Sequence, residues 1–580
     1  MVQPPALPQE TPPLPCPSTN WRERTRPWWW PALVALGTWL SVVVSIDPAG
    51  SYPHCPEGPG LTIDEIFNVQ QGVYLIEALR TYHLGLLDPR VLREVFVEHH
   101  LPDHPPLGRL WLGLHHDIVQ RFFPPHDPEG PFVVACARWG SATAFALTIL
   151  LVGGMTSLWL SRWAGLMAAL ALALMPRAYG HAHLAALESC LGLTSTLTVL
   201  AVAHTWAGEA PPAGRTALWT GLCFGLALLT KIQAIFLPIP LAWWAWRRWK
   251  WRAARPLALW AGAGLVLFFL GWPWLWFAPA KHLGAYLAGT TERATLSVWY
   301  ADTQYTDRTV PRSYALAVFF AVMPVKLLLL GSLGFLGRRP SWRRAGPAEA
   351  APPKLPWTPR ESLLFWELVF PLAVFSLPGV PIYDMERLWL PQVMPLCAVF
   401  VGRGAEIPLE RLQTVWMFRR SRVQAVLLLL MMLQVRALVA IHPCYLSHYG
   451  MLVRGVSGAA RGGWEVNYWG DAVTRSLLAD VAARTPRGAT VAVAPVLHQF
   501  QVEELWRQSP ILRRQGIRLV PYDPEHHPTE FVLLFRRLAD LPPDWRNLPR
   551  GVERLAEVQR EGITLAALYR LPEAGSARTP

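Results

Sequence analysis

The sequence predicts a polytopic α-helical membrane protein that carries a small α/β domain after its last span. Three observations support this fold class. The 580 residues are 52% hydrophobic with a mean hydropathy of +0.23, more apolar than a soluble domain needs. The excess lies in runs that approach the ~20 residues a helix needs to cross a bilayer. Arg-rich clusters, often beside Trp, separate several of these runs, as cytoplasmic loops with interfacial aromatic residues do.

The apolar runs predict about eleven transmembrane helices within residues 28–441. The first run lacks a small-residue cleavage site, so we interpret it as a retained signal anchor. The preceding residues 1–27, rich in Pro and polar side chains, are expected to form a disordered cytoplasmic N-terminus. The runs cover residues 28–46, 132–153, 163–176, 184–206, 216–230, 232–246, 256–277, 313–335, 362–378, 388–402 and 423–441.

The basic clusters give the orientation of these spans. With the N-terminus inside and alternating spans, every cluster falls on the cytoplasmic side. The outer loop 47–131 and the segment 442–580 then lie outside. The clusters are Arg22 with Arg24 and Arg26, Arg247 to Arg252, Arg338 to Arg344, and Arg419 with Arg420 and Arg422.

Two outer segments are large enough to carry structure of their own. In the outer loop, Ile66, Val69, Val73 and Ile76 have helical spacing, which predicts amphipathic helices lying along the membrane surface. The segment 442–580 alternates strand-like and helical runs, which predicts a small external α/β domain. The strand-like runs are 490–493, 531–535 and 564–569, and the helical runs are 472–483 and 499–508.

Charge and cysteine usage exclude other classes of protein. The net charge of +13 would favour nucleic-acid binding in a soluble protein, but here the basic residues lie between apolar runs, so no nucleic-acid partner is expected. The 7 cysteines are scattered without CxxC spacing, which argues against a structural zinc site. Cys55 and Cys444 would both lie outside and could pair.

The first candidate site is the acidic pair Asp64-Glu65 in the outer loop. A carboxylate at the outer surface can act as a general base toward a hydroxyl, and a neighbouring carboxylate can raise its pKa or hold the acceptor. The alternative is the start of a helix, with Thr62 as N-cap and the two acids in the first turn.

Two further candidates border the return of this loop to the membrane. His104 opens the sequence His104-Pro105-Pro106-Leu107, and Arg138 lies near the outer end of the second span. Both side chains can bind phosphate or a sugar hydroxyl. An Arg within an apolar run is costly and therefore a functional candidate, although it could also extend its side chain to the interface.

A third group lies between the third and fourth spans. His181 and His183 are two residues apart, and Glu188 lies one turn into the next span. No third ligand is apparent nearby, so no metal site is expected. We predict instead that these residues line an outward cavity, because an unpaired acid at this depth must face water or a partner.

The last candidates are cations at outer span ends. The enrichment of Lys and Arg in cytoplasmic loops does not explain them there. Lys231 separates two apolar runs, and Tyr383-Asp384-Met385-Glu386-Arg387 enters the tenth span. Such cations would suit a clamp for a lipid-linked phosphate. A lysine between two short spans could also simply mark a membrane boundary.

Taken together, these motifs resemble the integral-membrane glycosyltransferases of the C-type fold (GT-C), specifically the group of protein O-mannosyltransferases and aminoarabinose (lipid A) transferases, similar to glycosyltransferase family 39. The resemblance covers most of residues 28–470. The matching pieces are Asp64-Glu65, His104 to Leu107, Arg138, Pro176 to His183 with Glu188, Gly225 to Lys231, Tyr383 to Arg387 with Pro391, and His442-Pro443 through Gly470.

The resemblance implies an inverting enzyme that transfers a sugar from a polyprenyl-phosphate donor to an acceptor at the outer face of a bacterial cytoplasmic membrane. Asp64 would be the base and Glu65 its supporting or acceptor-binding partner. Arg138, Lys231 and Arg387 would hold the lipid phosphate, with Tyr383 nearby, whereas His104, His181, His183 and Glu188 would line the cavity on the acceptor side. No metal or other cofactor is implied, because the lipid-linked sugar is a substrate.

The acceptor stays open among protein, lipid and glycan. The chain lacks the sugar-binding repeats that eukaryotic protein mannosyltransferases insert between spans, so protein O-mannosylation is not the default. The main alternative is a secondary transporter with a carboxylate and histidine pathway. Transporters place such groups near the bilayer midplane, often within inverted repeats, whereas here they gather at one face without a repeat. A passive anchor for an external binding module is the least favoured reading, because anchoring needs far fewer spans.

Overall fold

The computed structural model describes residues 26–289, 292, 294–337, 357–412, 420–546 and 548–572. The predicted disordered N-terminus lies outside the described residues except for its last two positions. The basic residues predicted at 338–344 and at 419 also lie outside them.

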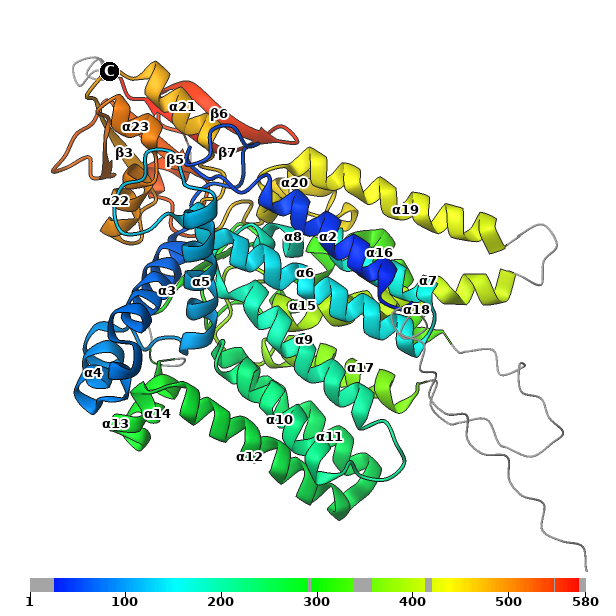
Figure 1. The fold of residues 1–580 in the computed structure, drawn as a ribbon. Coiled ribbons are helices and arrows are strands. Elements are labelled where there is room, and N and C mark those ends of the chain that lie inside the picture. Colours follow the sequence, from blue (N-terminus) through cyan, green and yellow to red (C-terminus); the bar gives the residue numbers. More distant parts are fainter. Residues whose placement is uncertain are drawn as a thin grey trace, which may run out of the picture.

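A bundle of helices forms most of the chain before residue 442 (Figure 1), and each of the predicted apolar runs overlaps at least one of its helices. Helix α6 lies at the centre, because it packs against α2, α5, α7 and α9. The helices are α2 (Trp29–Val43), α5 (Pro106–Phe122), α6 (Val134–Trp159), α7 (Arg162–Ala173), α8 (Pro176–Ala182), α9 (Leu187–Thr205), α10 (Gly214–Leu228), α11 (Pro238–Trp249), α12 (Ala254–Gly271), α13 (Trp274–Phe277), α14 (Pro279–Ala288), α15 (Tyr314–Val322), α16 (Val325–Leu336), α17 (Pro359–Val374), α18 (Leu390–Leu412) and α19 (Arg420–Ile441).

Not every helix of the bundle has the length of a membrane span. By length and composition, four helical stretches of the described residues could cross a membrane, namely 134–159, 187–205, 232–271 and 420–441. Helices α15 and α16 meet at 112° and would add a fifth if they form one span. Other apolar runs form helices of 12 to 16 residues, such as α7 and α17. The structure therefore gives several apolar helices but does not establish eleven spans.

The first outer loop is helical, but its longest helix is placed differently from the prediction. Helix α3 (Ile63–Tyr82) is followed by η1 (His83–Leu87), α4 (Pro89–Arg93) and η2 (Glu94–His99). Ile66 and Val69 are buried, and α3 packs against α5. The contact is so close that a Cβ on Gly72 would lie 2.3 Å from a backbone oxygen of α5. Two residues of the predicted membrane-facing side, Ile66 and Val69, thus pack against protein, whereas Val73 and Ile76 are half-buried.

The segment after the bundle forms a five-stranded sheet at one end of it (Figure 1). The strand order is β4-β3-β5-β7-β6, with β3 parallel to β4 and β5, and β7 antiparallel to β5 and β6. The predicted strand-like runs coincide with β3, β5 and β7. The bounds are β3 (Thr490–Ala494), β4 (Arg518–Pro521), β5 (Phe531–Phe535), β6 (Glu553–Arg560), β7 (Ile563–Arg570), α20 (Gly455–Arg461), α21 (Arg475–Arg484), α22 (Gln499–Arg507), α23 (Pro510–Arg514) and α24 (Pro543–Arg546), and a separate hairpin joins β1 (Ser297–Tyr300) and β2 (Thr303–Thr306).

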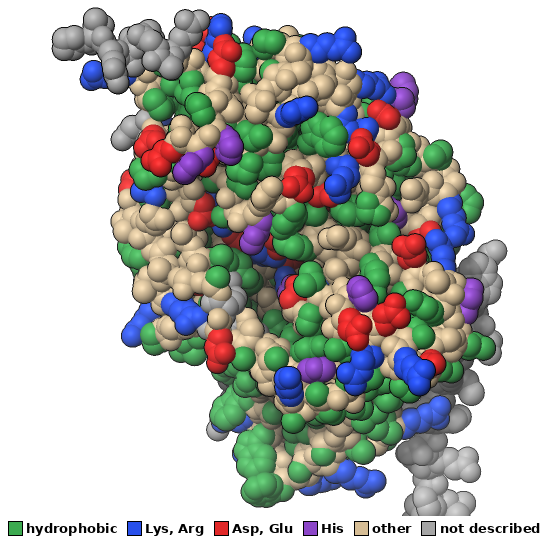
Figure 2. Space-filling view, turned by 90° about the vertical axis from the view of Figure 1, so that its left-hand side faces the viewer, with side chains coloured by type: hydrophobic (Ala, Val, Ile, Leu, Met, Phe, Trp, Pro, Cys, Tyr) green, Lys and Arg blue, Asp and Glu red, His purple; other side chains and the backbone are tan. Residues whose placement is uncertain are grey.

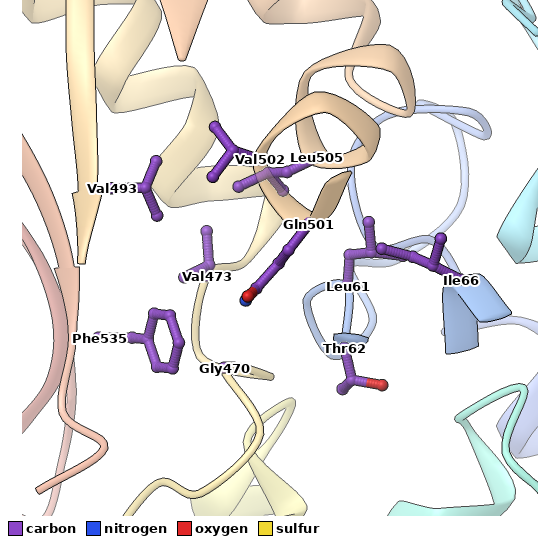
Figure 3. Close-up of a pocket in the computed structure, with 10 residues that line it drawn as sticks. All are labelled: Leu61, Thr62, Ile66, Gly470, Val473, Val493, Gln501, Val502, Leu505 and Phe535. Atoms are coloured by element: carbon purple, nitrogen blue, oxygen red, sulfur yellow. The ribbon is translucent and has the colours of Figure 1, made fainter. Parts of the chain in front are cut away.

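This sheet segment is joined firmly to the start of the outer loop. Figure 3 shows the joint, where Leu61 and Ile66 face Val473, Val493 and Phe535 across an apolar gap of only about 10 Å³. A partly buried ion pair adds to the joint, since the Arg475 guanidinium lies 2.9 Å from the Asp47 carboxylate. The gap is too small for a substrate. The close packing around it fixes the position of the segment that leads into Asp64.

Candidate active site

Asp64 lies in the first turn of α3, at the edge of a charged cluster. Its side chain is 28% exposed, and it accepts a hydrogen bond from the Arg387 guanidinium. The two residues are more than 300 positions apart along the chain, so the fold, not local sequence, brings them together. The predicted base therefore lies beside one of the predicted phosphate-binding cations.

Arg387 is the centre of this cluster. Its Nε donates to Glu188 at 2.9 Å and its Nη1 to Asp384 at 2.9 Å, in addition to the bond with Asp64. The guanidinium also stacks over the Trp469 ring, 4.3 Å from the ring centroid, with the Tyr383 ring at 5.8 Å. Three of its five N–H groups are thus committed to carboxylates, and aromatic rings fix its plane.

Lys231 is the second cation of the cluster. Its Nζ lies 2.6 Å from Glu188 Oε1, the same oxygen that accepts from Arg387. Glu188 and Lys231 are both almost fully buried, which a charge tolerates only with a partner. Four separate segments, at α3, at α9, before η3 (Ile232–Phe236) and before α18, therefore place their charged groups at one point.

A large cavity opens beside the cluster. It has a volume of about 650 Å³, and Lys231, Tyr383 and Arg387 form part of its wall together with His104. Figure 2 shows this side of the molecule hollowed near its centre, with acidic and basic side chains inside the hollow. Most of the remaining wall is apolar, with Ile235, Phe236, Trp274, Val374, Phe375, Val380 and Leu388 among its residues.

Three polar atoms of the cavity residues have no hydrogen-bond partner among the described residues. They are Nδ1 of His104, Oε1 of Gln233 and the hydroxyl of Tyr286. Unpartnered buried polar atoms are rare in proteins because each costs free energy. Their position in a cavity wall is typical of a site whose ligand or water supplies the missing partners.

Helix α5 holds the turn that carries His104 in place. Arg109, which is fully buried, lies 2.8 Å from the Asp103 carboxylate and donates to the backbone oxygen of Leu101 at 2.7 Å. Burial lowers the pKa of His104 to about 3, against the opposing charge of Asp103, so its imidazole is neutral. A neutral imidazole in the cavity wall can donate or accept one hydrogen bond.

Glu65 and Arg138 pair with each other and not with the charged cluster. Both are fully buried and their ion pair spans 2.7 Å. The other N–H groups of Arg138 donate to the second oxygen of Glu65 and to three backbone oxygens. Glu65 also accepts hydrogen bonds from Thr62 and from the backbone N–H of Ala185. Glu65 thus forms the helix-start arrangement with Thr62, and Arg138 has no donor left for a phosphate. The predicted binding of a phosphate by Arg138 and of an acceptor by Glu65 therefore does not fit this geometry.

The two predicted cavity histidines are also core residues. His183 is fully buried, with its ring nitrogens 3.2 Å from the Ser45 hydroxyl and 2.9 Å from the Tyr179 backbone oxygen. His181 lies 3.8 Å from Glu386, which pairs with Arg177 at 2.7 Å. Neither histidine lines the cavity. Within the described residues no group of metal-ligating side chains is found, and Cys55 and Cys444 are free thiols.

The structure adds residues that the sequence prediction missed. Asp384 belongs to the motif from Tyr383 to Arg387, of which the sequence predicts only Tyr383 and Arg387 as site residues. Trp469 stacks on Arg387 and donates a hydrogen bond to Asp384 at 3.1 Å. Like Asp384, it is indicated by the sequence only through its place in a segment that resembles the family. Gln233 and Tyr286 had no signal, because a single polar residue in an apolar run predicts nothing by itself.

Comparison with known proteins confirms the resemblance. Residues 101–287 match the family model of dolichyl-phosphate-mannose-protein mannosyltransferases. This range contains His104, Glu188 and Lys231, but not Asp64 or Arg387. No curated protein matches the chain. The family match gives no support to the alternative of a secondary transporter.

Several solved structures of membrane glycosyltransferases are similar to this chain. ArnT from Cupriavidus metallidurans, bound to undecaprenyl phosphate, is 14% identical with a TM-score of 0.47, over 94% of this chain and 98% of that one. The S. cerevisiae protein O-mannosyltransferase Pmt1-Pmt2 complex, bound to the sugar donor, is 17% identical with a TM-score of 0.31, over 49% and 39%. Oligosaccharyltransferase AglB from Archaeoglobus fulgidus is 12% identical with a TM-score of 0.44, over 89% and 70%.

Proposed function

We propose that the protein is an inverting glycosyltransferase that moves a sugar from a polyprenyl-phosphate donor to a protein, lipid or glycan acceptor. The observation that carries the proposal is the convergence of Asp64, Glu188, Lys231 and Arg387 beside a cavity of about 650 Å³. The family match over residues 101–287 supports the reaction class.

Lys231 and Arg387 are the groups that would hold the donor phosphate. Both line the cavity, and Arg387 retains N–H groups that its three carboxylate partners do not use. As the sugar–phosphate bond breaks, negative charge grows on the phosphate, so fixed cations stabilise the transition state more than the ground state. The apolar wall of the cavity would suit the first part of the lipid chain.

Asp64 is the group that would accept the proton. The acceptor hydroxyl gives its proton to the Asp64 carboxylate while its oxygen attacks the anomeric carbon. The bond from that carbon to the phosphate oxygen breaks, and the phosphate keeps the electron pair. Attack from the face opposite the phosphate inverts the configuration. A phosphate on Arg387 would compete with Asp64 for the guanidinium, which would free the carboxylate to act as base.

The unpartnered atoms of His104, Gln233 and Tyr286 would bind hydroxyl groups of the substrate. The proposal needs no metal and no other cofactor. We place the reaction at the outer face of a bacterial cytoplasmic membrane, with the N-terminus inside and the sheet segment outside. In Figure 1, α2 begins and α9 ends away from the sheet, which agrees with this orientation.

The direct test is transfer from a labelled polyprenyl-phosphate sugar by the purified full-length protein. We expect release of polyprenyl phosphate, and we expect Asp64→Asn to lower turnover by about a hundredfold to ten-thousandfold, the usual contribution of a general base. The control is Glu77→Gln, which removes an exposed carboxylate from the same helix. Equal turnover for Asp64→Asn and Glu77→Gln would rule out the assigned base.

A further inference from the structure

Arg537 reaches the charged cluster from the C-terminal sheet. It follows β5, the central strand of the sheet, by two residues, and its side chain is buried. Its guanidinium leaves the sheet and lies 3.2 Å from Asp384 Oδ1, while its Nε donates to Asp540 at 2.5 Å. It also donates to the backbone oxygen of Tyr468. A residue just after β5 therefore contacts Asp384, whose neighbour Tyr383 lines the cavity.

Asp384 bridges two guanidinium groups. One carboxylate oxygen accepts from Arg537, and the other accepts from Arg387 at 2.9 Å. Asp384 also has a backbone φ of +53°, a region that residues other than glycine rarely adopt. Such a conformation persists only where its surroundings hold it. The bridge between the two arginines is part of those surroundings.

The bond from Arg537 to the Tyr468 backbone acts on the same site. Tyr468 immediately precedes Trp469, whose ring lies under the Arg387 guanidinium and whose Nε1 donates to Asp384. Arg537 thus contacts two groups that hold Arg387 in place. They are the Asp384 carboxylate and the backbone next to Trp469.

We propose that Arg537 is a positioning residue for Arg387, so that the C-terminal sheet supplies part of the donor-phosphate site. Arg537 neutralises Asp384 and holds its carboxylate in place. Without Arg537, Asp384 would have Arg387 as its main cationic partner, which would draw that guanidinium toward the sheet and weaken its positive potential in the cavity. This inference rests on the proposed function, because it assigns Arg387 to the donor.

The test compares Arg537→Gln, Arg537→Lys and the control Arg536→Gln in the full-length protein. Arg536 precedes Arg537 but is only half-buried and has no side-chain bond to the cluster in the described residues. We expect Arg537→Gln to raise the donor KM about tenfold with a smaller fall in kcat. Arg537→Lys should recover part of the loss because it keeps the charge without the planar fork. An unchanged donor KM in Arg537→Gln would overturn the proposal.

A double-mutant cycle separates positioning from a general structural role. Because Arg537 acts on Arg387 mainly through Asp384, the variant carrying both Asp384→Asn and Arg537→Gln should lose much less kcat/KM than the product of the two single losses. Independent losses that multiply would overturn the proposal. If Arg537→Gln fails to accumulate, the same cycle is measured with Arg537→Lys, and losses that multiply in that double variant would again overturn the proposal.

A binding measurement distinguishes failure of this proposal from failure of the proposed function. Sugar-free polyprenyl phosphate is titrated onto the unsubstituted protein and onto Arg537→Gln. About tenfold weaker binding in the variant supports the positioning role even if no transfer is detected. Equal binding overturns it even if Asp64→Asn abolishes transfer as expected.

Discussion

The neighbouring carboxylates Asp64 and Glu65 occupy opposite kinds of environment. Glu65 is fully buried, and one arginine, one backbone N–H and the Thr62 cap satisfy it completely. Asp64 is partly exposed and shares a single guanidinium with two other carboxylates. One acid is therefore locked into the fold, whereas the other can exchange its partner.

This difference shows how a charged residue that stabilises the fold can be distinguished from one that can bind a ligand. A buried ion pair in which every donor and acceptor is used stabilises one geometry and leaves nothing for a ligand. A cluster in which Arg387 and Lys231 serve several acids, beside a cavity with unpartnered polar atoms, can accept an anion by exchanging partners. The same residue types thus give different functions through the completeness of their bonding.

The largest effect on folding is expected from breaking the Glu65–Arg138 pair. Glu65→Ala leaves a fully buried guanidinium without its carboxylate, which costs about 3–5 kcal/mol for such pairs. The Glu65→Ala variant should therefore show a strongly lowered unfolding temperature, or fail to accumulate in the membrane. The measurement is thermal unfolding of the purified protein in detergent.

The matched control is Asp64→Asn, which should unfold close to the temperature of the unsubstituted protein. The double variant Glu65→Ala with Arg138→Met should recover stability relative to Glu65→Ala alone, because it removes the unpaired charge. If Glu65→Ala had normal stability and lost only activity, the comparison would be wrong. Glu65 would then have a functional role, as Asp64 does.

The next effect concerns the donor. Arg387→Gln removes a charged partner for the phosphate, and hydrogen bonds to charged groups contribute about 1.5–3 kcal/mol, so donor affinity should fall about tenfold to a hundredfold. Arg138→Gln, in whatever folded fraction it yields, should bind the donor normally. The measurement is titration with polyprenyl phosphate. Weaker binding by folded Arg138→Gln and not by Arg387→Gln would reverse the assignment.

The helices and the sheet could be predicted because their signals are local. Apolar runs and alternating patterns are read within a few turns, which is why the strand-like runs coincide with β3, β5 and β7. The side of α3 that faces protein could not be read in the same way. Its apolar residues would suit a membrane surface equally well, and only the close approach of α5 decides between them.

The site was predictable only in part, because bonding partners are a property of the fold. Asp64 stood out as an acid of the first outer loop, and Lys231 and Arg387 as cations at outer span ends, and these three residues converge. Arg138 stood out for the same reason but meets Glu65 instead. Nothing in the sequence near Arg537 indicates that it reaches Asp384, more than 150 positions away.

The smallest effect extends the comparison to a third carboxylate, the buried Glu465. It accepts backbone N–H groups of Leu538 and Ala539 at 2.8 and 2.9 Å, while the nearby Arg537 is bonded to other acids. Burial raises the pKa of Glu465 to about 8, although Arg537 opposes the shift and Asp540 adds to it. Unlike Glu65, it is buried without an arginine of its own.

A raised pKa makes the contribution of Glu465 to stability depend on pH in a defined direction. Above its ordinary pKa of about 4.5 the unfolded chain loses the proton that the folded protein retains, so stability falls as pH rises toward about 8. We expect the loss between pH 6.5 and pH 8 to be about 1–2 kcal/mol. Glu465→Gln should remove this dependence and gain stability relative to the unsubstituted protein at pH 8. The measurement is the unfolding temperature of both proteins at the two pH values, and an equal fall in the two proteins would show that the carboxylate is ionised in the fold.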